Sequence, residues 1–316
     1  MPNGSLLVDI HHHALLPDLT GAVRLGSVDI PPWKIDDSIA FMDKVGIDVG
    51  ALTLTSPGIP FGDKVKARDI ARRVNETLAG FVDRYPTRLL AMAALPLPHM
   101  DASLEELRYA IDVLKLDGVG VLSHYGAYFG TQHYEPLYGQ LHERSLPVHI
   151  HPTPPVLTAD QDLGLPPSLY EYTFESTRVA AAIIYNNLFA KFPNLKLILS
   201  HAGGTVPFLA KRLSYGPQIT ASLAAAAPKD IVGELGKFYF DLAMTNARFN
   251  LPALNALVGT DRILYGSDFP FMPTGSITES MKDAFEYPDF SKIDLVRIGS
   301  HNAATLFPKI AARLGL

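Results

Sequence analysis

Eight short apolar runs, separated by longer segments with helical patterns, recur along the whole chain and constrain its fold more than any other feature. The runs are β-branched or Leu-rich and are bounded by Gly, Pro or Asp. Such runs alternating with helices are typical of βαβ units. The predicted strands are residues 6–10, 48–54, 89–94, 118–123, 147–151, 195–200, 238–242 and 262–265. Eight strands of this kind predict an α/β fold, a closed (β/α)8 TIM barrel.

The segments between the runs carry helix signals. In residues 67–85, apolar side chains recur at four-residue spacing and predict one apolar stripe against the barrel wall. Residues 103–106 have the spacing of a capping box, which predicts a helix that opens there and runs through Lys115. A last helix is expected over residues 302–316, on the outside of the barrel.

Length and charge exclude several classes of protein. The 316 residues contain no linker or low-complexity segment, so we expect one domain over residues 1–316. A net charge of -5 without a run of Lys or Arg argues against nucleic acid and anionic membranes as partners. No apolar stretch is long enough to span a membrane, and the N-terminus lacks the basic region of a signal peptide. We therefore expect a cytoplasmic protein.

Two long insertions follow predicted strands, at residues 14–33 and 152–172. In a barrel of this type, the loops after the strands lie at the carboxyl-terminal face, where active sites are found. Both insertions are therefore candidate lids, and a purely structural loop is the alternative for each.

Histidines mark the ends of several predicted strands. The chain has 11 His and no Cys, which excludes disulfides, thiolate metal sites and Cys nucleophiles. His11 and His13 end the first strand, and the two-residue period of a strand points both into the barrel, with His12 pointing away. His151 ends the fifth strand, and His201 and Asp268 follow the sixth and eighth strands. These ends meet at one rim of the barrel.

Neutral imidazoles and one carboxylate suit a divalent ion such as Zn²⁺, with Mn²⁺ or Fe²⁺ possible on the same ligands. A lone histidine in a core is more often a hydrogen-bonded structural residue. Several at the same rim favour a metal site instead. Three His and one Asp leave room for water or a substrate oxygen, as in catalytic rather than structural sites.

Four motifs together resemble the amidohydrolase superfamily. They are Val8-Asp9-Ile10-His11-His12-His13, His151-Pro152, Ser200-His201-Ala202-Gly203-Gly204 and Tyr265-Gly266-Ser267-Asp268-Phe269-Pro270. Within the superfamily they resemble the decarboxylase branch, which includes aminocarboxymuconate semialdehyde decarboxylase and hydroxybenzoate decarboxylases. The softer strings Gly118-Val119-Gly120-Val121-Leu122, Tyr125-Gly126, Tyr170-Glu171-Tyr172 and Thr177-Arg178 most resemble 6-methylsalicylate decarboxylases. The resemblance implies a carboxy-lyase that releases CO₂ from a small aromatic hydroxy acid without an organic cofactor.

The resemblance also implies roles for individual residues. His11, His13, His151 and Asp268 correspond to ligands of one metal ion, with zinc expected first and manganese as the alternative. His201 corresponds to an active-site histidine rather than a main ligand. Binuclear members carry a carboxylated Lys on the fourth strand, and residues 118–123 contain none, so we expect a mononuclear site. Relatives of this kind are commonly dimers or tetramers, which implies a homodimer or homotetramer.

Two residues near these ligands are candidates for supporting them. His149 shares a face with His151 but lies one layer deeper, as a hydrogen-bonding neighbour of the site or as core packing. Asp9 is placed by the two-residue period on the same face as His11, and we expect its carboxylate to accept a hydrogen bond beside the metal ligands.

Decarboxylation of an aromatic acid requires a proton on the ring carbon that bears the carboxylate. We hypothesise that Asp268 delivers this proton and that His201 orients Asp268 or shuttles the proton. The alternative is a metal-dependent hydrolase or hydratase in which Asp268 activates water to attack a lactone, an amide or an alkene. A third possibility is a barrel that binds a ligand without catalysis, although every metal-ligand position is filled.

Three further residues are candidate substrate contacts. Trp33 and Tyr125 lie in loops after strands and can stack on an aromatic ring, although loop aromatics more often pack the mouth of the barrel. Arg178 is a candidate partner for the substrate carboxylate, with a solvated or structural arginine as the alternative.

Overall fold

A computed structural model describes residues 5–21, 24–25, 28–60, 62–155, 163–245 and 248–315, and its central feature is one sheet of eight parallel strands. Both faces of the strands are buried, which is why they appear in the sequence as nearly continuous apolar runs. In sheet order the strands are β1 (Val8–His13), β4 (Val49–Thr53), β5 (Leu89–Ala94), β6 (Gly118–Leu122), β9 (Pro147–His151), β10 (Lys196–Leu199), β11 (Tyr239–Asp241) and β12 (Ile263–Leu264).

Backbone hydrogen bonds between the first strand and the segment that follows β12 close the sheet. The N–H of Ile10 donates to the carbonyl of Tyr265 at 3.0 Å, and the N–H of His13 donates to the carbonyl of Phe269 at 2.8 Å. His12 and Phe269 form a parallel bridge. The predicted (β/α)8 TIM barrel is confirmed, and all eight predicted strands are present within a few residues of their expected bounds.

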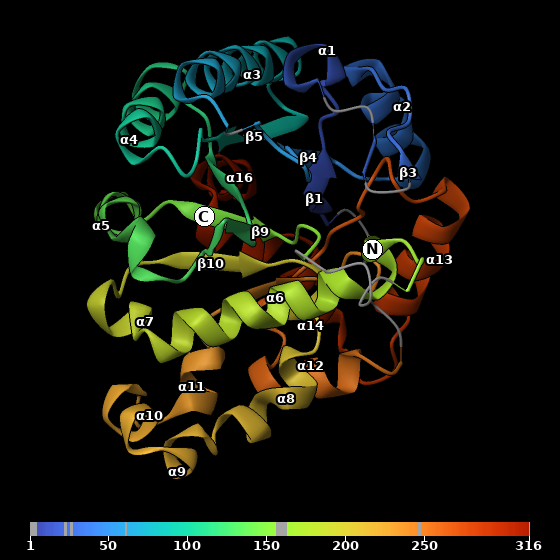
Figure 1. Ribbon diagram of the computed structural model, residues 1–316. Coiled ribbons are helices and arrows are strands. Elements are labelled where there is room, and N and C mark those ends of the chain that lie inside the picture. The colour runs from blue at the N-terminus through green and yellow to red at the C-terminus, as the bar shows by residue number, and fades with distance from the viewer. Residues whose placement is uncertain are drawn as a thin grey trace.

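Helices surround the strands (Figure 1). The described helices are α1 (Pro17–Thr20), α2 (Ile35–Val45), α3 (Lys64–Arg84), α4 (Met100–Arg108), α5 (Glu135–Arg144), α6 (Pro167–Tyr185), α7 (Leu188–Lys191), α8 (Val206–Leu213), α9 (Gly216–Ile219), α10 (Ala221–Ala226), α11 (Ile231–Leu235), α12 (Leu251–Val258), α13 (Thr274–Phe285), α14 (Lys292–Val296), α15 (Asn302–Leu306) and α16 (Pro308–Leu314). None of them combines the length and the apolar character needed to cross a membrane.

Two predicted helices differ in detail from those observed. The helix expected to open with a capping box at Ser103 begins at Met100, because Ser103 is buried and its hydroxyl has no partner among the described residues. Glu106 instead accepts hydrogen bonds from Arg72 and Asn75 of α3. The C-terminal helix is divided into α15 and α16 at Pro308, which cannot donate a backbone hydrogen bond within a continuous helix.

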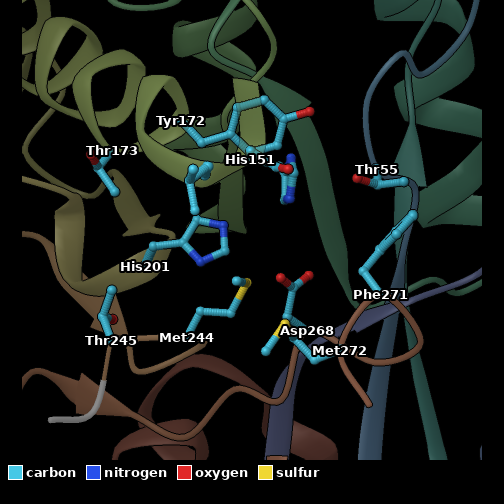
Figure 2. A pocket seen from close by; sticks show the side chains of 12 residues that line it. Thr55, His151, Tyr172, Thr173, His201, Met244, Thr245, Asp268, Phe271 and Met272 are labelled. Atoms are coloured by element: carbon cyan, nitrogen blue, oxygen red, sulfur yellow. The ribbon is translucent and has the colours of Figure 1, made fainter. Parts of the chain in front are cut away.

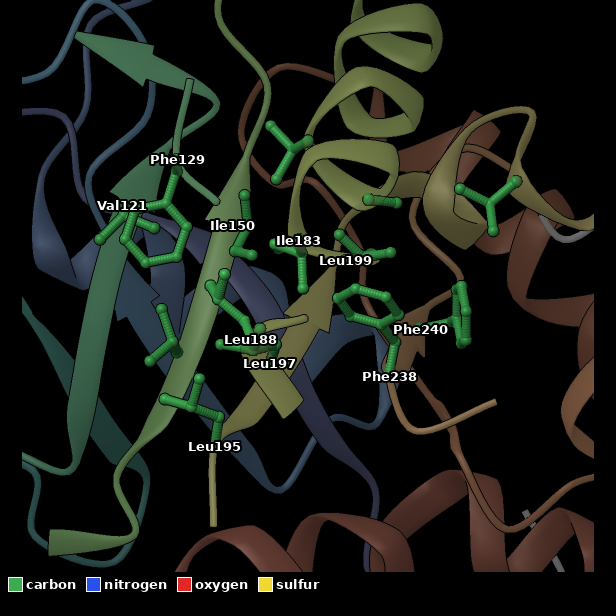
Figure 3. Packing of buried hydrophobic residues seen from close by; sticks show 14 of the residues in the cluster. Val121, Phe129, Ile150, Ile183, Leu188, Leu195, Leu197, Leu199, Phe238 and Phe240 are labelled. Atoms are coloured by element: carbon green, nitrogen blue, oxygen red, sulfur yellow. The ribbon is translucent and has the colours of Figure 1, made fainter. Parts of the chain in front are cut away.

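Apolar side chains from neighbouring strands and from α6 form the largest of the core clusters. Figure 3 shows Ile150 and Leu199 of adjacent strands packed with Ile183 of α6, and Phe240 of β11 beside them. This packing fixes α6 against the barrel, and α6 begins inside the second long insertion, whose residues 167–172 are helical. Residues 22–23, 26–27 and 156–162 of the two candidate lids lie outside the described residues, so a lid function stays a prediction.

Candidate metal centre and active-site cavity

Four side chains from three parts of the barrel rim meet at one point. His11 and His13 come from β1, His151 from the end of β9 and Asp268 from the loop after β12. One ligand atom of each residue lies within 4.8 Å of those of the other three. The Nε2 atom of His13 is 3.0 Å from both His11 Nε2 and Asp268 Oδ1. All four residues that the sequence analysis assigned to a metal therefore lie together, because their strands end at the same rim of the barrel.

Hydrogen bonds at the far side of two rings leave the inner nitrogen free to bind a cation. The Nδ1 atom of His11 lies 2.9 Å from Asp241 Oδ2, and Nδ1 of His151 lies 2.7 Å from the carbonyl oxygen of Pro152. An acceptor at Nδ1 places the proton there and directs the lone pair of Nε2 inward. The donor set thus fits a divalent ion that prefers nitrogen and oxygen ligands.

The electrostatics of the site favour positive charge at its centre. Desolvation lowers the pKa of His13 to about 4, helped by the nearby His11, so the ring of His13 is neutral at neutral pH. Burial would lower the pKa of His11 as well, but Asp241 and Asp268 outweigh it and raise this pKa to about 10. The two carboxylates therefore hold a proton on His11, and a divalent cation can supply the same positive charge.

His201 and Asp268 both adopt left-handed backbone, with φ of 56° and 59°. Residues other than Gly rarely adopt this conformation, and it persists where the surroundings enforce it. The N–H of His201 donates to Asp241 Oδ1 at 3.0 Å, and its Nδ1 is 3.0 Å from the carbonyl oxygen of Ala243. The N–H of Asp268 donates to the carbonyl of His11 at 2.9 Å. These contacts fix both side chains at the rim.

Asp241 is a central residue that the sequence analysis missed. It is fully buried at the end of β11, and its Oδ2 lies 2.9 Å from His11 Nδ1 and 3.0 Å from His149 Nε2. Its Oδ1 accepts the N–H groups of His201 and Ala243. Burial opposes its ionisation, but His11 and His149 hold the pKa of Asp241 well below its usual range. An acidic residue inside the apolar run of residues 238–242 was the available signal.

Asp9 accepts a hydrogen bond from His11, as expected, but from its backbone N–H, which lies 3.1 Å from Oδ1, while Asp241 holds the ring of His11. Asp9 pairs with Gly50 and His12 pairs with Leu52, so β1 has one more residue than β4 between these pairs. This bulge interrupts the two-residue period and places Asp9 beside His12, with 2.9 Å between Oδ2 and Nδ1. His149 is a neighbour of the site: its ring lies 4.7 Å from that of His11, centroid to centroid, and its Nε2 lies 3.0 Å from Asp241 Oδ2.

A cavity of about 170 Å³ opens beside Asp268, His151 and His201 (Figure 2). An apolar cavity of about 150 Å³ can hold benzene, so this volume suits one aromatic ring. The other lining residues are mostly apolar or hydroxyl-bearing: Thr55, Ser168, Leu169, Tyr172, Thr173, Met244, Thr245, Phe271 and Met272. No Lys or Arg of the described chain lines it.

The three predicted substrate contacts lie away from this cavity. The indole N–H of Trp33 donates to Ser38 Oγ at 2.9 Å, on the helix side of the barrel wall. Tyr125 is buried, and its hydroxyl accepts the N–H of Leu122 at 2.8 Å. Arg178 is exposed and pairs with Glu175. Substrate contact by these three residues stays a prediction, and their present partners give each a structural role.

Comparisons with known proteins agree with this geometry. A family model described as Amidohydrolase matches residues 8–309. The chain is 32% identical over 316 residues to the 6-methylsalicylic acid decarboxylase of Penicillium expansum, with 96% of each chain covered. It is 29% identical to a gamma-resorcylate decarboxylase of Rhizobium radiobacter, with 86% of each covered. A solved dihydroxybenzoic acid decarboxylase from Polaromonas sp. JS666, with bound manganese and the inhibitor 2-nitroresorcinol, superposes with a TM-score of 0.81, 27% identity and 97% of each chain covered.

Proposed function

The chain belongs to the amidohydrolase family, and we propose that it is a metal-dependent decarboxylase, a carboxy-lyase, acting on a small aromatic hydroxy acid of the 6-methylsalicylate or hydroxybenzoate type. The observation that carries this proposal is the group of three imidazoles and one carboxylate at the wall of a cavity sized for one aromatic ring. The family resemblance identified from the strand-end motifs is confirmed.

We assign His11, His13, His151 and Asp268 as ligands of one divalent ion. Zinc is our first choice and manganese the alternative, since the Polaromonas enzyme binds manganese. When bound, the ion supplies Lewis-acid charge for the carboxylate and the adjacent phenolic oxygen of the acid. Strand β6 carries no lysine to bridge a second ion, and no organic cofactor is part of the proposal.

The protein's own residues pass on to the ring carbon the proton that the reaction consumes. The bond between the ring carbon and the carboxylate carbon breaks, CO₂ leaves, and the electron pair forms a bond from the ring carbon to a proton taken up from solvent. We assign delivery of this proton to Asp268, which lines the cavity. His201 has its Nδ1 engaged by the Ala243 carbonyl, which leaves Nε2 to orient Asp268 or to pass the proton.

The hydrolase or hydratase alternative uses the same four residues with water as the nucleophile. The relatives named above are decarboxylases of aromatic acids, which favours the decarboxylase. A homodimeric or homotetrameric state, a cytoplasmic location and a single domain over residues 1–316 belong to the same proposal.

The test combines metal analysis of the purified protein with a panel of 6-methylsalicylate, salicylate, 2,6-dihydroxybenzoate and unsubstituted benzoate. We expect about one divalent ion per chain and release of CO₂ from the 2-hydroxy acids. In D₂O, deuterium should enter the product at the carbon that carried the carboxylate. Hydrolysis of lactones or amides, with no CO₂ from any acid in the panel, would replace this proposal by the alternative.

A further inference from the structure

His12, the middle residue of the histidine triplet, points away from the cavity and joins a buried chain of hydrogen bonds. Its Nε2 lies 2.8 Å from Ser38 Oγ of α2, and Ser38 Oγ accepts the indole N–H of Trp33 at 2.9 Å. Its Nδ1 lies 2.9 Å from Asp9 Oδ2. An indole N–H only donates and a carboxylate only accepts, so Trp33 donates to Ser38 Oγ and the Nδ1–H of His12 donates to Asp9.

Asp9, at the end of this chain, joins the two strand ends that carry candidate metal ligands. Its Oδ1 accepts the N–H of His11 at 3.1 Å and the N–H of Ser267 at 2.9 Å. Its Oδ2 accepts the hydroxyl of Ser267 at 2.6 Å. Asp9 and His12 are fully buried, so these bonds are not shared with bulk water. One carboxylate thus links the backbone at His11 to the residue that precedes Asp268.

The segment held by Asp9 needs such support. Asp268 has a left-handed backbone with φ of 59°, a conformation that residues other than Gly keep only where the surroundings enforce it. The next residue, Phe269, stacks on Phe41 of α2 with ring centroids 4.1 Å apart and lies 5.1 Å from the ring of His12. The packing of Phe269 on α2 and on His12 therefore helps to fix the position of the neighbouring Asp268.

We propose that His12 is a positioning residue, which orients the Asp9 carboxylate so that Asp9 holds Asp268 at its place beside His11 and His13. This inference rests on the proposed function, because it concerns the placement of the proposed proton donor. Asp9 binds the backbone N–H of His11 and not its ring, which Asp241 holds. Loss of the hydrogen bond between His12 and Asp9 should therefore displace Asp268, while the imidazoles of His11, His13 and His151 stay in place.

The test compares three variants of the full-length, metal-loaded protein. His12→Leu removes both hydrogen bonds, and His12→Asn restores a donor close to the position of Nδ1 and hence the bond to Asp9. The control is Asn75→Ala, because Asn75 is a buried polar residue of α3 that bonds Ala94 and Glu106 outside this network. Ser38→Ala, a milder change outside the barrel, replaces His12→Leu if that variant does not fold.

We expect His12→Leu to lower kcat by about 10- to 100-fold with KM within threefold, since small displacements of a reacting group cost rate rather than binding. His12→Asn should recover most of the loss, and Asn75→Ala should keep kcat within threefold at a similar loss of Tm. The visible spectrum of the Co²⁺-loaded protein should shift in His12→Leu as it does in Asp268→Asn. It should stay as in the wild type in His12→Asn.

Two results would overturn the inference: a kcat within threefold of the wild type in His12→Leu, or an equal loss in Asn75→Ala. A wild-type protein that releases no CO₂ from any acid would refute the proposed function instead. The Co²⁺ spectra would then still test the placement of Asp268, because they do not depend on turnover.

Discussion

Replacing Asp241 by Asn should impair metal binding through the tautomer of His11. The amide oxygen of Asn can still accept the N–H groups of His201 and Ala243, each 3.0 Å from Oδ1 of Asp241. Its NH₂ group then faces His11 Nδ1 and His149 Nε2, which lie 2.9 and 3.0 Å from Oδ2. Both nitrogens must become acceptors, so the proton of His11 moves to Nε2 and blocks the lone pair that a metal needs.

The expected size of this effect follows from the supporting role of the lost carboxylate. Changes to the hydrogen-bond partner of a ligand histidine cost about 10- to 100-fold in metal affinity, which equals roughly 1.4–2.7 kcal/mol. Competition for Zn²⁺ with a chelator of known affinity measures this directly. Asp117→Asn is the matched control, because the side chain of Asp117 is only 7% exposed and bonds Ala91 and Lys309 outside the site.

The reasoning fails if Asp241→Asn binds zinc within twofold of the wild type while keeping its fold. It fails equally if Asp117→Asn loses as much affinity, since the effect would then report general destabilisation. A double variant with His11→Ala further separates an effect through the tautomer of His11 from general destabilisation. Once the ring of His11 is absent, Asp241→Asn should have little additional effect on zinc affinity.

Further predictions concern the proton donor, its partner and the metal-free state. Asp268→Asn should lower kcat by about 100-fold or more in CO₂-release assays with the acid still bound, and near-normal turnover would contradict the proton-donor role. His201→Ala should lower kcat far more than metal content, whereas equal losses would identify His201 as a ligand. Because the folded-state pKa of His11 is raised to about 10, its contribution to stability is complete below its unfolded pKa near 6.5 and is lost as the pH rises to 10. The Tm of the chelator-treated protein should therefore decline over this range, and His11→Gln should remove that part of the decline.

Strands were the most predictable part of the fold. The bounds of β5 and β9 match the prediction, because strands buried on both faces must be continuous apolar runs. Helix starts were less predictable, since they depend on tertiary contacts. Ser103 has the local pattern of a cap, yet burial of its side chain leaves the helix to begin at Met100.

The convergence of the four candidate ligands also followed from the sequence, because parallel strands in a barrel end at one rim. Their supporting contacts did not follow. The bulge in β1 adds one residue against β4, and no local pattern in residues 8–13 announces it. It brings the carboxylate of Asp9 beside the ring of His12, a contact that the two-residue period does not predict. The cavity wall was equally hidden, because Leu169, Met244 and Phe271 come from loops and helix ends far apart in the chain.

The two buried aspartates explain how the rim keeps strained backbone at two positions. Asp241 binds the ring of His11 and the N–H of His201, and Asp9 binds the backbone of His11 and the N–H of Ser267, next to Asp268. Each carboxylate therefore links His11 to one of two left-handed segments, the one at His201 or the one at Asp268. Buried carboxylates are stable only when their hydrogen bonds are complete, so both segments depend in part on contacts with β1. The candidate proton donor and its partner thus depend on the same strand that carries two of the metal ligands.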